Sequence, residues 1–402
     1  MIKFHIGIIR EGKIPHDKRV PFTPAQCREL KQKFPGIGIT VQPSPYRCYP
    51  DDEFTSAGIP LIEDLSDCDI LIGIKEVPVD MLIPEKTYIF FSHTIKKQPH
   101  NQKMFMEIVR KRIRLIDYEC LTRPDGLRVL GFGRFAGIVG VHNGLRAYGL
   151  RHGLFNLKPA HHCFNREEMN RELRSVTLPS MKIAITGEGR VATGAKESLQ
   201  VANIRQVTPE EYLSKNFNEP VFCQLGVTQY NQRKDGKPTD EHDFYKHPED
   251  YETAFSPYSR ATDLFISCHF WDPGAPRLFS VEEMRSDDFR INVIADISCD
   301  INGSIPSTIR STTIEDPLYG FNPFTGKEDQ PFGKGSITVM AVDNLPCELP
   351  RDASEDFGDQ LMKNVMERLL GDDPEGMIQR AVITEGGKLK EKYSYLEDYL
   401  CA

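Results

Sequence analysis

The sequence contains no long hydrophobic run. None of its apolar stretches approaches the ~20 residues that a membrane-spanning helix requires, so no membrane protein is expected. The N-terminus, "MIKFHIGIIREGK", enters a strand-like stretch directly and has no signal-peptide pattern. Together these absences predict a cytoplasmic protein.

Paired cysteines are also missing. The ten cysteines are scattered singly, without a C-x-x-C pair, which is typical of reduced thiols in a cytosolic protein. The one cluster that resembles a metal site, His161-His162-Cys163, has no matching second pair of ligands. We therefore expect this cluster to be a loop, and we predict no metal site.

An excess of basic residues is absent as well. Lys and Arg number 50 against 58 Asp and Glu, which gives a net charge of −8, whereas a nucleic-acid surface normally needs a basic face. A small anionic substrate stays possible, because a local pocket can be basic on an acidic protein. With 402 residues, of which 39% are hydrophobic and 27% charged, the chain has an ordinary globular composition and the length of two domains.

Short apolar runs alternate with helix-like segments in roughly the first third of the chain. The runs are of the kind that is buried on both faces of a parallel sheet. The segment "TPAQCRELKQKF" has a helix start signal, with Thr23 as N-cap and Pro24 at the first helical position. The expected strands are Phe4–Ile9, Ile37–Gln42, Ile70–Ile74, Tyr88–Phe91 and Ile113–Tyr118. The alternation predicts an α/β fold with a parallel sheet and crossover connections.

The remaining sequence is less regular. The Gly-rich stretch 131–153 suits a tightly packed helix, and a second α/β unit opens at Met181. Residues 213–260 are polar and longer than an ordinary connection, so we expect a surface excursion or lid there. Apolar segments return at "DLFISC" and "RINVIADIS". The C-terminal stretch that begins "EDFGDQLMKNVMERLLG" is expected to form helices that close the structure.

The segment "MKIAITGEGRVATGAKESLQ" indicates a nucleotide-binding turn. Ile183–Thr186 is a predicted strand, and a helix is predicted from Val191 onwards. Between them, Gly187 and Gly189 would let the backbone approach a pyrophosphate at the helix N-terminus. The spacing to Gly194 departs from G-x-G-x-x-G, but the strand before and the helix after favour a dinucleotide site.

The choice between NAD and NADP stays open. An NAD site commonly has an acid about 20 residues further on, at the end of the second strand, where it binds the ribose diol. We expect that strand in "ANIRQVTPEE", whose end offers Val207 and Thr208 and no acid before Glu210. Arg205 is a candidate partner for a 2′-phosphate, although an exposed strand Arg is the commoner case.

Ionisable residues follow several of the predicted strands. Because ligands of an open α/β sheet bind beyond the carboxyl ends of its strands, these residues should gather at one edge. They are Arg10, Lys75 with Glu76, His93 and Glu119. A partly desolvated Lys near other cations and a His can both exchange protons near neutral pH, so Lys75 and His93 are a candidate acid/base pair.

Candidate anchors for substrate carboxylates lie in the neighbouring loops. Lys13 and Arg19 follow the first strand, and Arg128 follows "RPDGL". Arg grips a carboxylate with two parallel hydrogen bonds, which fixes its orientation. Combined with a dinucleotide turn, this set suggests hydride transfer on a small substrate that carries several carboxylates.

Six motifs together resemble one known family. They are "GIKEVP", "YIFFSHTIK", "RLIDYE", "FGRFAG", "GEGRVATGA" and "DNLPCELPRDASEDFGD". The chain resembles the saccharopine dehydrogenase (L-lysine-forming) family over nearly its whole length, and especially its lysine–ketoglutarate reductase branch. The likeness includes "DFYKHPEDYE" and "WDPGAPRL" of the polar stretch.

The resemblance implies the fold of alanine dehydrogenase, with two Rossmann-like domains and a cleft between them. Residues 1–137, completed by 345–402, would form the substrate-binding domain, and 138–344 the dinucleotide-binding domain. It also implies the reaction, in which L-lysine and 2-oxoglutarate condense to an imine that NAD or NADP reduces to saccharopine. No nucleic-acid or membrane partner is implied.

The resemblance also implies roles for individual residues. Lys75 and His93 match the family's acid/base pair, and Glu119 matches a carboxylate near the substrate amine. Substrate-binding positions would be Lys13, Arg19, Glu76, Glu119 and Arg128. Cofactor-binding positions would be Gly187, Gly189, Arg190, Val191, Gly194, Asp296, Asp300, Asn344 and Leu345. The family's fungal members carry an acid near the position of Thr208, whereas the reductase branch favours NADPH.

Two rival functions follow from the same residues. One is an amino-acid dehydrogenase of the alanine dehydrogenase type, or an opine-like synthase, since the Lys/His pair occurs in both settings. Glu119 with its surrounding "RLIDYE" and the long polar stretch favour saccharopine chemistry. The other is a dinucleotide-binding module without catalysis, which would be expected to lose Lys75 or His93. The oligomeric state and the direction of flux are not predicted.

Overall fold

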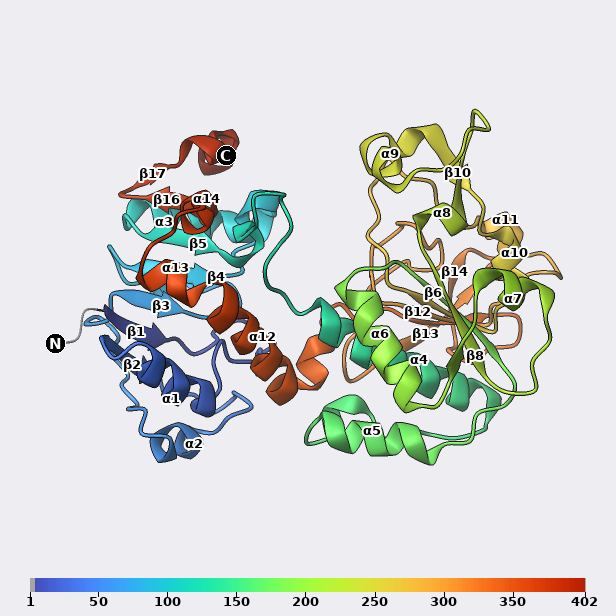
Figure 1. Ribbon diagram of the computed structural model, residues 1–402, viewed down its shortest axis with the longest axis horizontal. Coiled ribbons are helices and arrows are strands. Elements are labelled where there is room, and N and C mark those ends of the chain that lie inside the picture. The colour runs from blue at the N-terminus through green and yellow to red at the C-terminus, as the bar shows by residue number, and fades with distance from the viewer. Residues whose placement is uncertain (1–3, 402) are drawn as a thin grey trace. The chain divides into compact units, whose positions relative to one another are not determined.

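The computed structural model describes residues 4–401, which divide into two compact units (Figure 1). Unit 1 comprises Met1–Phe132 and Pro350–Ala402, and unit 2 comprises Gly133–Leu349. Each unit has its own sheet and its own hydrophobic core. The chain is therefore an α/β protein in which the C-terminal segment returns to the unit formed by the N-terminal segment.

Unit 1 is built on a seven-stranded sheet in the order β17-β16-β5-β4-β3-β1-β2. Its strands are β1 (Phe4–Ile8), β2 (Ile37–Val41), β3 (Ile70–Ile72), β4 (Thr87–Phe90), β5 (Arg114–Asp117), β16 (Val382–Glu385) and β17 (Lys388–Leu389). The first five are parallel, and β16 pairs antiparallel with β5. The five strands expected from the sequence are thus confirmed, whereas β16 and β17, in a stretch expected to be helical, were missed.

Helices cover this sheet from both ends of the chain. They are α1 (Pro24–Lys33), α2 (Asp51–Ser56), α3 (Gln102–Arg110), α12 (Pro350–Asn364), α13 (Met366–Leu370), α14 (Met377–Ala381) and α15 (Glu397–Cys401). Thr23 caps α1 in a capping box with Gln26, and Pro24 opens the helix, as predicted. On α12, Phe357 stacks on Phe132 with ring centroids 4.5 Å apart and meets Tyr118 edge-on. This aromatic cluster joins the C-terminal helix to the first sheet.

Unit 2 is built on an eight-stranded sheet in the order β14-β13-β15-β12-β11-β6-β8-β7. Its strands are β6 (Lys182–Thr186), β7 (Arg205–Gln206), β8 (Val221–Leu225), β11 (Leu264–Ser267), β12 (Val293–Asp296), β13 (Leu318–Asn322), β14 (Lys327–Asp329) and β15 (Ile337–Met340). The six from β15 to β7 are parallel, and β13 and β14 form an antiparallel extension. The predicted strands around "KIAIT", "DLFISC" and "INVIAD" are confirmed.

The helices of unit 2 include the Gly-rich helix expected from the sequence. They are α4 (Gly133–His152), α5 (Arg166–Ser175), α6 (Arg190–Val201), α7 (Pro209–Ser214), α8 (Val227–Tyr230), α9 (Glu241–Lys246), α10 (Ser256–Ser259) and α11 (Val281–Met284). The axes of α4 and α6 lie side by side (Figure 1). A Cβ at Gly137 or Gly194 would collide with the backbone of the other helix, so the small residues allow this close packing.

The second strand of this unit in chain order forms in the predicted segment but is short. The segment around Arg205 forms only the two-residue strand β7 at the edge of the sheet, and the neighbour of β6 is β8. Strand β8 lies inside the polar stretch 213–260 that was expected to be an excursion. The polar residue Gln224 makes this strand hard to recognise from the sequence. In the structure, the Nε2 of Gln224 donates to the carbonyl oxygen of Gly187 at 2.9 Å.

The remainder of that polar stretch forms a small antiparallel hairpin. Its strands are β9 (Asn231–Arg233) and β10 (Tyr251–Thr253), with α9 between them. Phe244 and Tyr251 are buried against one another, and Arg233 pairs with Asp235 and Asp243. Among residues 4–401, no helix has the length and apolar character needed to cross a membrane.

Candidate active site

The candidate acid/base residues follow adjacent strands of the unit 1 sheet. Strands β5, β4, β3 and β1 are neighbours and run parallel, so their carboxyl ends share one edge. Lys75 and Glu76 follow β3, His93 follows β4, and Glu119 follows β5. Arg10, which follows β1, instead forms an ion pair with the exposed Glu63 and makes no contact with these residues among the hydrogen bonds of the described residues.

Glu76 connects two of the predicted site residues. Its Oε1 lies 2.6 Å from Nδ1 of His93, and its Oε2 lies 3.0 Å from Nζ of Lys13. Burial by itself would raise the pKa of Glu76, but the hydrogen bond with His93 and the charges of His93 and Lys13 hold that pKa below its usual range. Glu76 is therefore a carboxylate that fixes His93 and Lys13 in place.

His93 sits in an uncommon backbone conformation. Its φ is 51°, in the left-handed region that few residues other than Gly adopt. Next to it, Ser92 is fixed because its backbone N–H donates to Oδ2 of Asp117 at 3.0 Å. Such conformations concentrate at functional sites, where the surroundings hold them in place. Here the turn directs the imidazole toward Glu76.

Lys75 is held by its backbone and leaves its side chain available. Glu11, which follows β1, accepts hydrogen bonds from the backbone N–H groups of Ile74 and Lys75 at 2.6 and 2.8 Å. Within residues 4–401, the Nζ of Lys75 makes no ion pair. Burial lowers the pKa of Lys75, and the positive charges of Arg19 and Lys13 lower it further. Lys75 is thus closer to deprotonation at neutral pH than an exposed lysine.

The predicted anchor Arg19 is buried and bound to an acid. Its Nε and Nη2 donate to the two carboxylate oxygens of Asp17 at 3.0 and 2.6 Å, and its guanidinium lies 4.0 Å from the ring centre of Phe132. Both side chains are only 2% exposed. Arg19 therefore acts on the site through its charge, which reaches Lys75.

Glu119 has one carboxylate oxygen occupied and one available. Its Oε1 accepts from Lys96 at 3.0 Å and lies 3.1 Å from Nη2 of Arg128. Its Oε2 is buried and has no hydrogen-bond partner among the described residues. Burial would raise the pKa of Glu119, but Lys96, Arg128 and His93 hold it below its ordinary value. A buried acceptor without a partner is costly, so it is suited to a donor from a ligand.

In unit 2, the predicted nucleotide turn has the required geometry. Gly187 has a φ of 91°, and a Cβ there would stand 2.8 Å from the carbonyl oxygen of Cys268, so only glycine fits. Gly189 is the N-cap of α6, and no atom lies within 4 Å of the point where its Cβ would be. The open space at this helix N-terminus fits a pyrophosphate.

A cavity of about 430 Å³ lies against this turn. Its walls are Gly187–Val191, Tyr245, Cys268–Phe270, Ile297, Ser298 and Asp300. Burial and the charge of Asp296 raise the pKa of Asp300. The cavity contains five of the residues for which a cofactor role was predicted, namely Gly187, Gly189, Arg190, Val191 and Asp300.

The other four residues with a predicted cofactor role lie off this cavity. Gly194 packs against α4, and Asp296 is buried with its Oδ2 accepting from Thr308 at 2.6 Å. Asn344 precedes the 3₁₀ turn Leu345–Glu348, and Leu345 is buried against Gly140 of α4. Their cofactor roles stay predictions.

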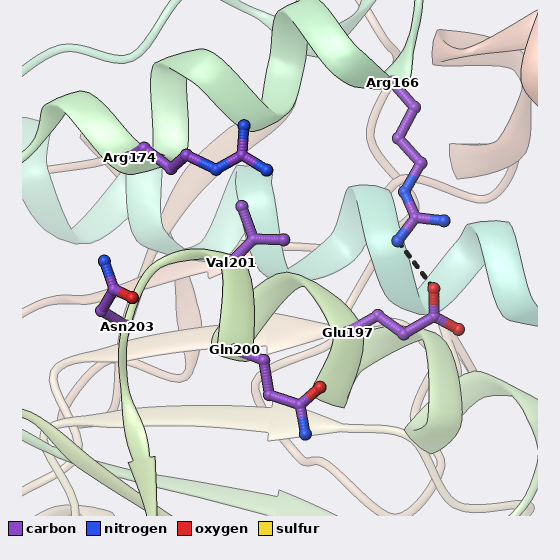
Figure 2. A pocket seen from close by; sticks show the side chains of 6 residues that line it. All are labelled: Arg166, Arg174, Glu197, Gln200, Val201 and Asn203. Carbon is purple, nitrogen blue, oxygen red and sulfur yellow. Dashed lines mark hydrogen bonds and ion pairs between the residues drawn. The ribbon is translucent and has the colours of Figure 1, made fainter.

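A second hollow of unit 2 contains no predicted site residue. Figure 2 shows it between α5 and the C-terminal half of α6, with Arg166 reaching Glu197 at 2.6 Å. Glu197 also binds Arg134 at 2.7 Å, so its charge is already neutralised within the fold. The described residues also contain no group of three or more His, Cys, Asp or Glu side chains that could hold a metal ion.

Several residues at these sites were not singled out from the sequence. Glu11 and Asp17 lie beside Lys75 and Arg19, and Glu11 could have been found because it follows β1 directly. In unit 2, His269 is buried between Thr186 and Ser304, at 2.7 and 3.0 Å. Burial lowers the pKa of His269 to about 4. Its position after β11 is the only signal that the sequence offered.

Comparison with known proteins places the chain among related enzymes. Residues 7–139 match the family model of the alanine dehydrogenase/PNT N-terminal domain. The alpha-aminoadipic semialdehyde synthase of Arabidopsis thaliana is 29% identical over 97% of this chain and 41% of its own length. The NAD(+), L-lysine-forming saccharopine dehydrogenase of Emericella nidulans is 28% identical over 89% of this chain and 91% of its own. These matches confirm the resemblance predicted from the motifs.

A solved structure shows the same fold. An L-alanine dehydrogenase superposes with a TM-score of 0.64 at 16% identity, covering 99% of each chain. The predicted fold of two Rossmann-like domains is thereby confirmed. The chain spans about half the length of the semialdehyde synthases that it matches, at 41 to 47%.

Proposed function

Because the chain is similar over most of its length to L-lysine-forming saccharopine dehydrogenases, we propose that it is an oxidoreductase of this family and interconverts saccharopine with L-lysine and 2-oxoglutarate. The reaction passes through an imine of the two products and uses NAD or NADP. The acid/base residues at the edge of the unit 1 sheet and the nucleotide turn of unit 2 support this proposal.

When bound, a nicotinamide dinucleotide would supply the hydride acceptor for the oxidative direction and the hydride donor for the reverse direction. Gly187, Gly189, Arg190, Val191 and Asp300 would hold the dinucleotide, because they surround the cavity at the N-terminus of α6. The open space at Gly189 is the observation that fits a pyrophosphate there.

In this mechanism, Lys75 and His93 move protons on the substrate. Lys75, with its lowered pKa, takes the proton of the secondary amine before oxidation. His93, fixed by Glu76, then removes a proton from the water that adds to the imine carbon and returns it to the leaving lysine amine. Both steps reverse during synthesis of saccharopine.

Positive side chains around these residues would bind the substrate carboxylates. Lys13 is half-buried beside Glu76, and the exposed side chains of Lys96 and Arg128 flank Glu119. Each forms an ion pair within the protein and retains donors for a further carboxylate, because Lys has three N–H donors and Arg has five. Arg19 supplies charge without contact, since Asp17 occupies it.

The observation that carries the proposal is the available oxygen of Glu119. Its buried Oε2 needs a donor, and the amine or ammonium of saccharopine or lysine supplies one. A simple amino-acid dehydrogenase substrate also has an ammonium group, so the substrate itself must be tested.

The test is the absorbance change of the nicotinamide, measured with purified protein and saccharopine in parallel with NAD⁺ and NADP⁺. We expect reduction of at least one cofactor, and formation of lysine and 2-oxoglutarate in equal amounts. If saccharopine gives no signal while alanine or another amino acid does, the substrate assignment is wrong and the protein is an amino-acid or opine dehydrogenase.

A further inference from the structure

The strand that lies beside β6 is not the second strand in chain order. In a Rossmann domain, an acid at the end of the second strand binds the hydroxyl groups of the adenosine ribose. The strand that lies beside β6 is β8, and it ends at Leu225 and Gly226. The usual position of the acid is therefore occupied by a glycine, which has no side chain to offer.

The carboxylate of Glu188 fills this position from the nucleotide turn. A Cβ at Gly226 would stand 2.5 Å from Oε2 of Glu188, so that oxygen lies directly over the end of β8. Glu188 also lines the cavity at the turn. Gly226 thus leaves room for an acid that is supplied by another segment.

Two hydrogen bonds fix the turn to the end of β8. The backbone N–H of Gly187 donates to the carbonyl oxygen of Leu225 at 2.8 Å, and the side chain of Gln224 donates to the carbonyl oxygen of Gly187 at 2.9 Å. Both anchors are adjacent to Glu188. These hydrogen bonds hold the backbone of the turn against the end of β8, and this places the side chain of Glu188 beside Gly226.

Glu188 has an acidic neighbour in Glu241, and one cation, Arg190 of the same turn, also lines the cavity. Tyr245, which lines the same cavity, is close enough to Glu188 and Glu241 that both carboxylates add to the effect of burial in raising its pKa. Residues 226–232 contain no Lys or Arg, and the next basic residue, Arg233, pairs with Asp235 and Asp243. Arg205, the earlier candidate for a 2′-phosphate, pairs with Glu219 at the edge strand.

We propose that Glu188 binds the 2′- and 3′-hydroxyl groups of the adenosine ribose and makes the protein select NAD over NADP. A carboxylate accepts hydrogen bonds from a ribose diol and repels a 2′-phosphate. This inference rests on the proposed function only in that a nicotinamide dinucleotide binds at the turn. The acid would come from the turn itself, as the middle residue of Gly187-Glu188-Gly189, and not from the end of the second strand about 20 residues further on.

The test is direct binding, measured by calorimetric titration of the full chain with NAD⁺ and NADP⁺ in the absence of substrate. We expect the unaltered protein to bind NAD⁺ at least about tenfold more tightly than NADP⁺, because a carboxylate a few ångströms from a 2′-phosphate repels it. In Glu188→Gln, which keeps the size of the side chain, the ratio should fall by about tenfold, mainly through tighter NADP⁺ binding.

Two control variants separate this site from the position expected from the sequence. Thr208→Asp places an acid where the sequence located the ribose, and Asp is as good a helix N-cap as Thr, so α7 should be retained. Glu210→Gln changes the charge of unit 2 by the same amount as Glu188→Gln. Neither should alter the ratio of the two dissociation constants.

The possible results are distinct. Preference for NADP⁺ in the unaltered protein, or an unchanged ratio in Glu188→Gln, would overturn the role of Glu188 while leaving the proposed function intact. A change in the ratio for Thr208→Asp would indicate that the ribose lies at the edge strand β7, and it would also overturn the role of Glu188. Binding of neither dinucleotide would overturn the proposed function itself.

Discussion

Nδ1 of His93 lies 2.6 Å from Oε1 of Glu76, although the two residues follow different strands of the sheet. The contact exists because β3 and β4 are parallel neighbours and both chains turn at the same edge. The other oxygen of Glu76 holds Lys13. One carboxylate thus positions both a proton-transferring group and a candidate substrate anchor.

Loss of this carboxylate should impair catalysis without loosening the cofactor. In Glu76→Gln, the amide has one oxygen for two partners, so His93 or Lys13 loses its acceptor. We expect kcat with saccharopine to fall about tenfold to a hundredfold, the usual range for a positioned proton-transfer group. The control Glu63→Gln removes an exposed partner of Arg10 and should leave kcat unchanged. An unaltered kcat in Glu76→Gln would remove the positioning role.

Lys75→Met should separate proton transfer from cofactor binding. The substitution keeps the length of the side chain and removes the amine whose pKa burial and Arg19 lower. We expect turnover to fall by about a hundredfold or more, while calorimetry gives an unchanged cofactor affinity. Lys31→Met, on the exposed face of α1, is the matched control. Normal turnover in Lys75→Met would exclude Lys75 as an acid/base residue.

Charge reversal at Arg128 should affect substrate binding. Arg128 is half-exposed beside Glu119, where a substrate carboxylate would meet its guanidinium. In Arg128→Glu we expect KM for saccharopine to rise about tenfold, with a much smaller change in kcat. Arg123→Glu, in the same turn, makes the same charge change at an exposed position. Equal KM values for the two variants would contradict the anchor assignment.

Two glycines of one motif should respond differently to alanine. At Gly189 a Cβ meets only open space, so Gly189→Ala should leave thermal stability unchanged and weaken dinucleotide binding by about tenfold. At Gly194 a Cβ would collide with the backbone of Arg134, so Gly194→Ala should lower the free energy of unfolding by about 3 kcal/mol. Thermal unfolding and calorimetric titration of both variants measure the difference. Lower thermal stability of Gly189→Ala would contradict the open space at Gly189.

Stability should fall in acid partly because of His269. Burial lowers its pKa from 6.5 to about 4, so the unfolded chain binds a proton between these pH values and the folded protein does not. The resulting stability is complete above pH 6.5 and decreases toward pH 4, by about 3 kcal/mol in total. Urea unfolding at several pH values should give a smaller slope for His269→Gln. Some slope should persist, since burial lowers the pKa of His142 to about 4 as well.

Local patterns in the sequence identified most of the elements that carry the candidate sites. The apolar runs before Lys75, His93 and Glu119 were recognisable as buried strands, and parallel strands place their carboxyl ends together. The turn Gly187-Glu188-Gly189 was recognisable from its strand and helix neighbours. These features depend on residues that are close in the chain, so a single sequence reveals them.

The order of strands in unit 2 was beyond such patterns. Strand β8 contains Gln224 and lies in a polar stretch, and whether it or β7 pairs with β6 depends on contacts between distant segments. The sequence alone offered only the segment around Thr208 as the position of the ribose. It did not indicate Glu188, whose reach over Gly226 exists only once β8 lies beside the turn.

By itself, the sequence determined the α/β class, the family resemblance and the set of ionisable residues that end adjacent strands. Only the tertiary structure decided which of them meet. In the folded protein Arg10 pairs with Glu63, and Arg19 is buried in an ion pair with Asp17. His93 is hydrogen-bonded to Glu76. Oε2 of Glu119 has no partner among the described residues. The reason is physical: periodicity and turn signals act over a few residues, whereas ion pairs and burial depend on segments that only folding brings together.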